Sequence, residues 1–95
     1  MPMNLKVLHN PALFRFEISV EGSTAIAEYV DRGDFLAITH TFVPEPLRGR
    51  GLAAMLVKAA LEYARANGKK VDPVCNYAAR FLEQHPEFAD LALTR

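Results

Sequence analysis

Two arginines and two glycines stand together at Arg48-Gly49-Arg50-Gly51, directly before an amphipathic pattern that begins at Leu52. The first amide groups of a helix have no partner inside the helix, and the helix dipole is positive at that end. Such an end binds anions, and glycine lets the anion approach because it has no Cβ atom. Arginine adds charge and paired hydrogen bonds that suit a phosphate or pyrophosphate. These residues therefore form either a seat for a phosphorylated ligand or an ordinary turn whose arginines face water.

The loop lacks the marks of two familiar phosphate-binding loops. No Gly-Lys-Ser/Thr sequence is present, which excludes a P-loop that holds nucleotide and magnesium. The three spaced glycines of a dinucleotide-binding loop are also missing, and the strands before this loop predict an antiparallel sheet instead of a parallel one. Any anion bound here is therefore held in another way.

Cys75 is the only cysteine, so no disulfide can form within the chain. It lies at the predicted start of a second helix, or within one turn of it, because Asp72-Pro73 and Asn76 are both good helix starts. The helix dipole favours the thiolate at such a position, and the thiolate is the reactive form of cysteine. Cys75 is either a reactive thiol or an inert member of the core.

The histidines show no partners at the spacing of metal ligands, so we expect no metal site. We interpret His9 and His85 as surface residues. His40 alternates in phase with the apolar residues Leu36 and Ile38, which is typical of a histidine in the core.

The elements that must position these residues begin with a sheet. Apolar residues occupy every second position of residues 14–20, as in a half-buried strand, and two further strands are predicted over residues 23–30 and 35–43. An earlier strand near residues 4–9 would pair with the first of these. The short turns between the strands predict an antiparallel meander.

Beyond the loop the apolar period becomes helical. The pattern predicts a helix from Leu52 to a stop at Asn67-Gly68, where glycine accepts the left-handed conformation of a helix end. A fifth strand is expected over residues 69–74, and a second helix over residues 76–84 that ends before Pro86. The fold class is therefore α+β, with an N-terminal antiparallel sheet followed by a helix, a fifth strand and a C-terminal helix.

The 95 residues suffice for one domain, residues 1–95, with its own core. The chain is 51% hydrophobic and 23% charged, and its basic and acidic residues balance, which argues against nucleic-acid binding. No apolar run is long enough to cross a bilayer and the first residues show no signal-peptide core, so we expect a cytoplasmic protein without membrane contact. We expect a monomer or a weak dimer, and an exposed edge strand of a short sheet would favour the dimer.

The segment Val43-Pro44-x-x-x-Arg48-Gly49-x-Gly51-Leu52-Ala53 resembles the acyl-CoA loop of the GNAT N-acetyltransferase superfamily, which also lies between an apolar strand and an amphipathic helix. The resemblance implies that the loop amides bind the pyrophosphate of acetyl-CoA, the cosubstrate, and that the preceding strand contacts its pantetheine arm. The residues so implied are Arg48, Gly49, Arg50, Gly51, Leu52 and Ala53 for pyrophosphate, with Phe42 and Val43 for pantetheine. Members of the superfamily often carry glutamine or arginine where this chain has Pro46, so one polar contact is not expected here.

Three segments resemble a smaller subgroup more closely, the minimal GNAT-like proteins of roughly a hundred residues that lack the N-terminal helices of typical members. They are His40-Thr41-x-Val43-Pro44, the loop itself, and Cys75-x-Tyr77 followed by Phe81-Leu82. The resemblance extends over about residues 14–88. It implies that Cys75 lies near the acetyl group of acetyl-CoA, where it either accepts that group as a thioester or only positions it.

The resemblance also suggests roles for three further residues. Tyr77 would give a proton to the departing CoA thiolate or pack against the CoA arm. Asn76 would contact that arm or only cap the helix. His40, the titratable ring nearest the expected acetyl group, is the candidate general base. The tyrosine that larger members place further along this helix is absent, because the chain reads Arg80-Phe81-Leu82 there.

These residues lead to three functional hypotheses. The first is an N-acetyltransferase that transfers acetyl from acetyl-CoA to an unknown amine, on a protein or a small molecule, either directly or through Cys75. The second is a module that binds CoA without turnover, as a sensor would. The third is a small interaction domain that binds no CoA. The substitution Arg48→Glu should abolish CoA binding under the first two and matter little under the third.

Overall fold

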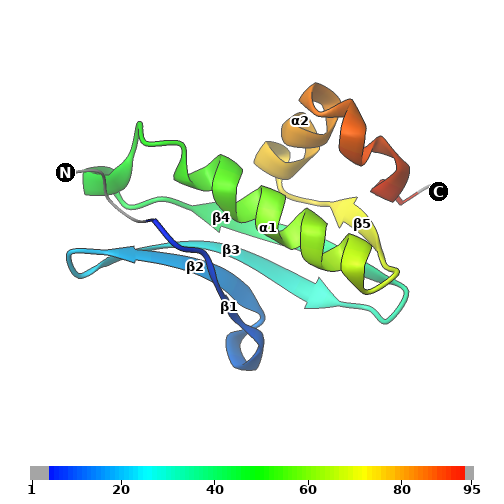
Figure 1. Ribbon diagram of the computed structural model, residues 1–95, viewed down its shortest axis with the longest axis horizontal. Coiled ribbons are helices and arrows are strands. Elements are labelled where there is room, and N and C mark those ends of the chain that lie inside the picture. The colour runs from blue at the N-terminus through cyan, green and yellow to red at the C-terminus, as the bar shows by residue number, and fades with distance from the viewer. Residues whose placement is uncertain (1–4, 94–95) are drawn as a thin grey trace.

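Residues 5–93 are described by a computed structural model of the chain (Figure 1). Within this range the strands form one mixed sheet in the order β1-β2-β3-β4-β5, in which β1 to β4 are antiparallel neighbours and β5 runs parallel to β4. The predicted α+β class is thus confirmed. In chain order the strands and helices are β1 (Leu8–Asn10), β2 (Arg15–Val20), β3 (Ser23–Asp31), β4 (Phe35–Phe42), α1 (Leu52–Ala66), β5 (Lys70–Pro73) and α2 (Asn76–Gln84). Short 3-10 turns occupy Pro11–Leu13, Glu45–Leu47 and Pro86–Leu91.

The boundaries of most elements lie close to their predicted positions. The helix α1 begins at Leu52, and Gly68 beyond its end has a φ of 67°, as expected for glycine at a helix stop. The strand β1 is shorter and later than the one expected over residues 4–9, because Asn10 already pairs with Arg15 across the hairpin. Asn4, part of that expected strand, lies outside the described residues.

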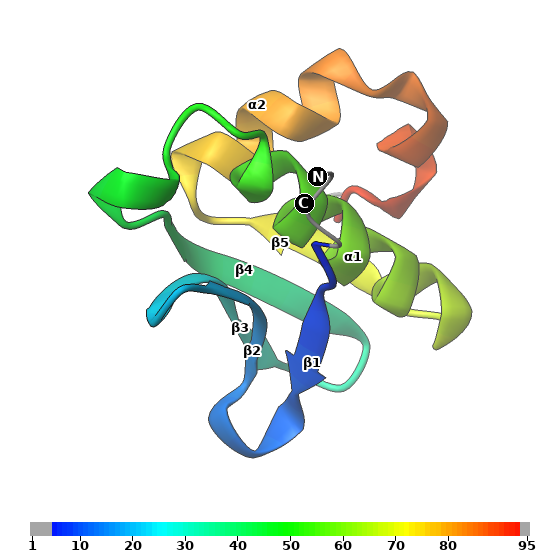
Figure 2. The ribbon, with the colours of Figure 1, turned by 60° about the vertical axis from the view of Figure 1, so that its left-hand side comes forward.

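One face of the sheet and the helices share a hydrophobic core. Figure 2 shows α1 lying along the sheet with α2 beside it. Burial of a large aliphatic side chain contributes about 1.5–3 kcal/mol, so the apolar stripe of α1 fixes both the helix and the loop in front of it. The buried residues of that stripe are Leu52, Leu56, Val57, Ala60, Leu61 and Ala64, and those of α2 are Ala78, Phe81 and Leu82.

A β-bulge in β4 changes the side of the sheet on which its later residues lie. Tyr29 pairs with Ile38, but the preceding residue, Glu28, pairs with His40, so Thr39 is an extra residue in β4. The inward alternation set by Ile38 therefore passes to Thr41, and His40 is exposed. The in-phase pattern that predicted a core position for His40 was wrong, because it assumed a strand without a bulge.

The strand β5 and the helix α2 meet at Cys75. Asp72 and Pro73 pair with β4, so the helix start predicted at these residues is wrong. Asn76 is the first helical residue and Cys75 takes the cap position before it. The backbone N–H of Cys75 donates to the carbonyl of Ile38 at 2.8 Å, which continues the β4–β5 pairing by one bond.

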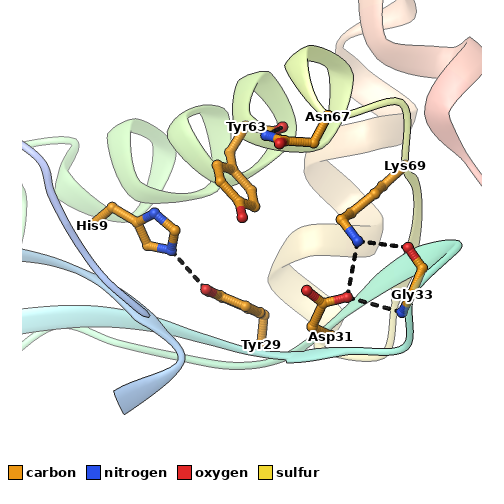
Figure 3. A network of polar contacts seen from close by, with 7 residues as sticks. All are labelled: His9, Tyr29, Asp31, Gly33, Tyr63, Asn67 and Lys69. Carbon is orange, nitrogen blue, oxygen red and sulfur yellow. Dashed lines mark hydrogen bonds and ion pairs between the residues drawn. The ribbon is translucent and has the colours of Figure 1, made fainter. Parts of the chain in front are cut away.

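His9 belongs to an aromatic cluster, so its interpretation as a surface residue is wrong. Its ring stacks on Phe16 at a centroid distance of 4.2 Å, and its Nε2 lies 2.6 Å from the hydroxyl of Tyr29 (Figure 3). Tyr63 of α1 presents its ring at 4.6 Å from that of His9. Burial lowers the pKa of His9 and raises that of Tyr29. The cluster therefore joins β1 to α1, and burial favours the neutral form of the imidazole.

A second polar group closes the turn after β3. Lys69 Nζ lies 3.1 Å from Asp31 Oδ1 and 2.6 Å from the carbonyl oxygen of Gly33, and the N–H of Gly33 donates to the same Asp31 oxygen at 2.9 Å (Figure 3). These bonds link the segment after α1 to the turn after β3. They lie at the C-terminal end of α1, whereas the arginine-glycine loop precedes its N-terminal end.

Candidate functional site

The arginine-glycine loop, residues 48–51, connects the 3-10 turn Glu45–Leu47 to α1. Gly49 and Gly51 have φ values of 82° and 75°, a left-handed conformation that side-chain-bearing residues rarely adopt. No atom lies within 4 Å of a Cβ built on either glycine, so the space above the loop is open. Both glycines are thus required by the path of the backbone, and they leave the loop accessible.

The first backbone N–H groups of α1, which directly follow the loop, are available to donate hydrogen bonds to an anion. The first helical bond of α1 runs from the N–H of Met55 to the carbonyl of Gly51, at 3.2 Å. The N–H groups of Leu52, Ala53 and Ala54 therefore have no acceptor within the helix. The first turn contains no acidic residue that would repel or replace an anion. This helix end has the donors and the charge to hold a phosphate group.

The two arginines of the loop have different surroundings. Arg48 Nε donates to the carbonyl oxygen of Val43 at 3.0 Å, so this side chain fastens the loop to the end of β4. Arg48 and Arg50 are both exposed, and neither takes part in the ion pairs found among residues 5–93. Arg50 is therefore free to meet an anion, whereas Arg48 also has a structural contact to keep.

Strands β4 and β5 separate beside Cys75. Their pairing ends at Ile38 and Pro73, beyond which β4 continues to Phe42 and the chain turns into α2. We call the region between Phe42 and the start of α2, beyond the last paired residues, the fork. Thr41 and Cys75 face each other in it, with the thiol donating to the Thr41 hydroxyl at an Sγ–Oγ1 distance of 3.5 Å.

The environment of Cys75 favours its thiolate. Burial raises the pKa of the thiol, but the hydrogen bond with the Thr41 side chain and the backbone groups of Ala78, Tyr77 and Thr41 lower it by more. The pKa therefore lies below its ordinary value, although the thiol makes no regular cap hydrogen bond to α2. Cys75 is half-buried, packs against the hydrophobic core and also meets the Thr41 hydroxyl, so its reactivity stays a prediction.

The other predicted site residues lie around the fork and on the sheet beside it. Phe42 is 46% exposed and Tyr77 is 40% exposed, and Asn76 is exposed at the first position of α2. Burial raises the pKa of the Tyr77 hydroxyl. The exposed ring of His40 lies near-parallel to that of Phe42, with centroids 6.4 Å apart. Sequence reasoning missed Thr41, whose contact with Cys75 depends on the bulge at Thr39.

A cleft between α1 and α2 adjoins the helix end. Its volume is about 230 Å³, and its lining combines apolar side chains with the polar residues Lys58, His85 and Glu87. Phe81 and His85 stack within it at a centroid distance of 3.8 Å, which places His85 partly inside the fold and not simply on its surface. The lining residues are Ala54, Met55, Lys58, Phe81, His85, Glu87 and Phe88.

A second hollow of similar volume lies at the opposite end of α1. There Arg65 pairs with the Asp90 carboxylate, and Lys70 donates to the Asp90 carbonyl at 2.7 Å. These contacts hold the C-terminal segment against the sheet, so we assign that hollow a structural role.

Residues 5–93 contain no group of three or more His, Cys, Asp or Glu side chains that could hold a metal ion. Over the same residues, none of the helices has the length and apolar character needed to span a bilayer.

The fold and the loop together define an acetyltransferase-type domain. The model of the GCN5-related N-acetyl-transferase family matches residues 15–91, and the chain belongs to that family, as its sequence predicted. It is 32% identical to Protein NATD1 of Danio rerio over 95 residues, which covers 94% of this chain and 86% of the relative. Protein NATD1 of Homo sapiens is 29% identical over 86 residues, or 86% of this chain and 75% of the relative. The solution NMR structure of a GCN5-like protein from Staphylococcus aureus matches with a TM-score of 0.75 and 28% identity, over 97% of this chain and 91% of that one.

Proposed function

We propose that residues 1–95 act as one domain that binds acetyl-CoA and transfers the acetyl group to an amine. The observation that carries the proposal is the open arginine-glycine loop at the N-terminus of α1, in a chain that belongs to the GCN5-related family. A cytoplasmic location suits this function, since the single cysteine would stay reduced there.

In this proposal the pyrophosphate of CoA binds the loop. The amides of Leu52 and Ala53 donate to it, Gly49 and Gly51 leave room for it, and Arg50 contributes charge. Arg48 supports the loop through Val43 and adds its remaining guanidinium donors. The pantetheine arm then runs past Phe42 and Val43 towards the fork, with Asn76 as a polar contact from α2.

The cleft between α1 and α2 is proposed to receive the adenosine end of CoA. Ala54 and Met55, which line the cleft, directly follow the loop amides along α1. Apolar walls suit a flat base, and Lys58 supplies the charge that the additional phosphate on the ribose requires.

At the fork the acetyl thioester would lie beside Cys75, and two routes follow. In the direct route the amine attacks the thioester carbonyl and the CoA thiolate leaves with a proton from Tyr77. His40, which the bulge turns to the outer side of β4, is the proposed acceptor of the amine proton for an amine that approaches from that side. Burial raises the pKa of Tyr77, so its hydroxyl holds a proton to give at neutral pH. In the two-step route the Cys75 thiolate takes the acetyl group as a new thioester, CoA leaves, and the amine then attacks Cys75-bound acetyl.

A second candidate function is CoA binding without turnover. Where larger members have a tyrosine, this chain has Phe81 and Leu82, and both side chains are buried in the core. No hydroxyl is available at that turn of α2, which favours a sensor if Tyr77 does not replace it.

Thermal unfolding with CoA, followed by an amine screen with acetyl-CoA, tests both candidates. A ligand at a hundred times its dissociation constant stabilises the folded state by roughly 2.7 kcal/mol. Stabilisation with acetyl transfer supports the enzyme, stabilisation without transfer to any amine supports the sensor, and no stabilisation contradicts both.

A further inference from the structure

Thr41 and Cys75 come from segments 34 residues apart and meet at the fork. Thr41 pairs with Ala27, which is fully buried, so its side chain lies on the inner side of β4. The bulge at Thr39 brings it there, since an unbroken alternation from Ile38 would have turned His40 inward. The Sγ–Oγ1 distance of 3.5 Å is within hydrogen-bond range for sulfur.

The backbone of Cys75 is held from both sides. Its N–H donates to the carbonyl of Ile38 at 2.8 Å, and its carbonyl accepts the N–H of Ala79 at 3.0 Å. With the main chain fixed, the sulfur can move only by rotation about the Cα–Cβ bond. The Thr41 hydroxyl favours the rotamer in which the sulfur faces the fork.

We propose that Thr41 is a positioning residue that holds the Cys75 sulfur in the fork and stabilises it as the thiolate. A hydroxyl can accept a hydrogen bond from the thiol and, after rotation, donate one to the thiolate. The bond from the Thr41 hydroxyl to the thiolate is stronger than the bond from the thiol to the hydroxyl, because its acceptor is charged. The use of this thiolate in acetyl transfer rests on the proposed function. The reactivity of the thiol itself can be measured on the protein without any ligand.

The surroundings of Cys75 agree with this role. Burial raises the pKa of Cys75, and the groups that lower it are the Thr41 side chain and backbone groups of Ala78, Tyr77 and Thr41. Thr41 is the residue that contributes to this lowering through its side chain, and the other contributions come from backbone groups. The titratable side chain nearest in sequence, Tyr77, has a raised pKa and is neutral. Removal of the Thr41 hydroxyl, which lies 3.5 Å from the sulfur, should therefore weaken the thiolate.

The test is the rate at which iodoacetamide alkylates the protein, measured against pH by mass spectrometry. The chain has a single cysteine, so every alkylated molecule reports on Cys75. Thr41→Val, which keeps the shape and removes the hydroxyl, should move the midpoint of the profile up by about one pH unit, about a tenfold loss of thiolate below the midpoint. Thr41→Ser should restore most of the rate.

Thr39→Val is the matched control. Thr39 lies on the same strand, and its exposed hydroxyl donates to the Glu28 carbonyl at 3.4 Å instead of touching Cys75. Its profile should coincide with that of the parent chain. The proposal is overturned if the Thr41→Val profile coincides with the parent profile, or if Thr41→Ser behaves like Thr41→Val, in proteins whose melting curves match. CoA-induced stabilisation, measured on the same samples, reports separately on the proposed function.

Discussion

Arg48 Nε donates a hydrogen bond to the carbonyl oxygen of Val43, at 3.0 Å, across the 3-10 turn that precedes α1. This bond joins Arg48, which we expect to contact the pyrophosphate of CoA, to Val43, which we expect to lie along the pantetheine arm. Arg48 thus links the loop to the end of β4, in addition to contributing charge. Arg48 therefore has a structural role as well as a charge, whereas Arg50 contributes only its charge.

Charge reversal at Arg50 should weaken CoA binding without loss of stability. Arg50 is exposed and takes no part in the ion pairs found among residues 5–93, so Arg50→Glu should lower CoA affinity at least about tenfold at an unchanged melting temperature. Arg48→Glu should lower both, because it also breaks the bond to Val43. Calorimetric titration with CoA and thermal unfolding measure the two effects. Equal melting temperatures for the two variants would contradict a structural role for Arg48.

Glycine is required at position 51 for two reasons that can be separated. The φ of Gly51 is 75°, so Gly51→Ala should destabilise the fold by about 1–2 kcal/mol through backbone strain. A steric clash adds nothing to this cost, because a Cβ at this position meets no neighbour. The strain should also shift the amides of α1 and weaken CoA binding. Gly33→Ala, at a φ of 86° in the turn after β3, should cost similar stability and leave CoA binding intact. Loss of CoA binding in both variants would mean that instability alone explains the effect.

His9 should make the stability of the fold depend on pH. Burial lowers the pKa of His9 below its ordinary value of 6.5, so the unfolded chain binds this proton more readily than the folded chain. Stability from the neutral ring is therefore complete above about pH 6.5 and declines as pH falls through the window towards the lowered pKa. Urea midpoints measured between about pH 8 and about pH 5 should fall for the parent chain and change less for His9→Phe. An equal fall in both would assign the effect to another group.

Glu17, Asp31 and Asp90 do not interfere with that measurement. The pKa of each is lowered: by the hydrogen bond from Arg15 for Glu17, by the backbone N–H of Gly33 for Asp31 and by the hydrogen bond from Arg65 for Asp90. Their ordinary values are 4.5 or lower, so their contributions are lost only at more acid pH.

The two catalytic routes differ in what they require of Cys75. The two-step route predicts that incubation with acetyl-CoA adds an acetyl group to Cys75, detectable by mass spectrometry, and that Cys75→Ala abolishes transfer. The direct route predicts no acetylated cysteine and a Cys75→Ala variant that keeps much of its activity. An unlabelled parent chain together with a fully active Cys75→Ala variant would end the two-step route.

Much of this fold could be predicted because its elements follow simple periods. The alternation of Phe16, Ile18 and Val20 matches the buried face that it predicted, and the helical period that begins at Leu52 predicted the helix α1 itself. The helix end at Gly68 could also be predicted, because the left-handed conformation of a glycine at a helix end is a local property of the sequence.

What could not be predicted depends on pairing between distant residues. The bulge at Thr39 exists only in the register between β3 and β4, and it decides that Thr41 and not His40 turns inward. The contact of His9 with Tyr29 likewise requires the hairpin register that places β1 beside β2. In the candidate site the loop residues were predicted from a local motif, whereas the contacts Arg48–Val43 and Thr41–Cys75 came only with the structure.

The central claim is that the amides around Gly49 and Gly51 hold the pyrophosphate of CoA. Calorimetric titration of the parent chain with CoA, and with pantetheine as a ligand that lacks the pyrophosphate, tests it most directly. We predict saturable binding of CoA at one site per chain, with pantetheine bound far more weakly. Absence of binding at millimolar CoA, or equal affinity for the two ligands, would contradict it.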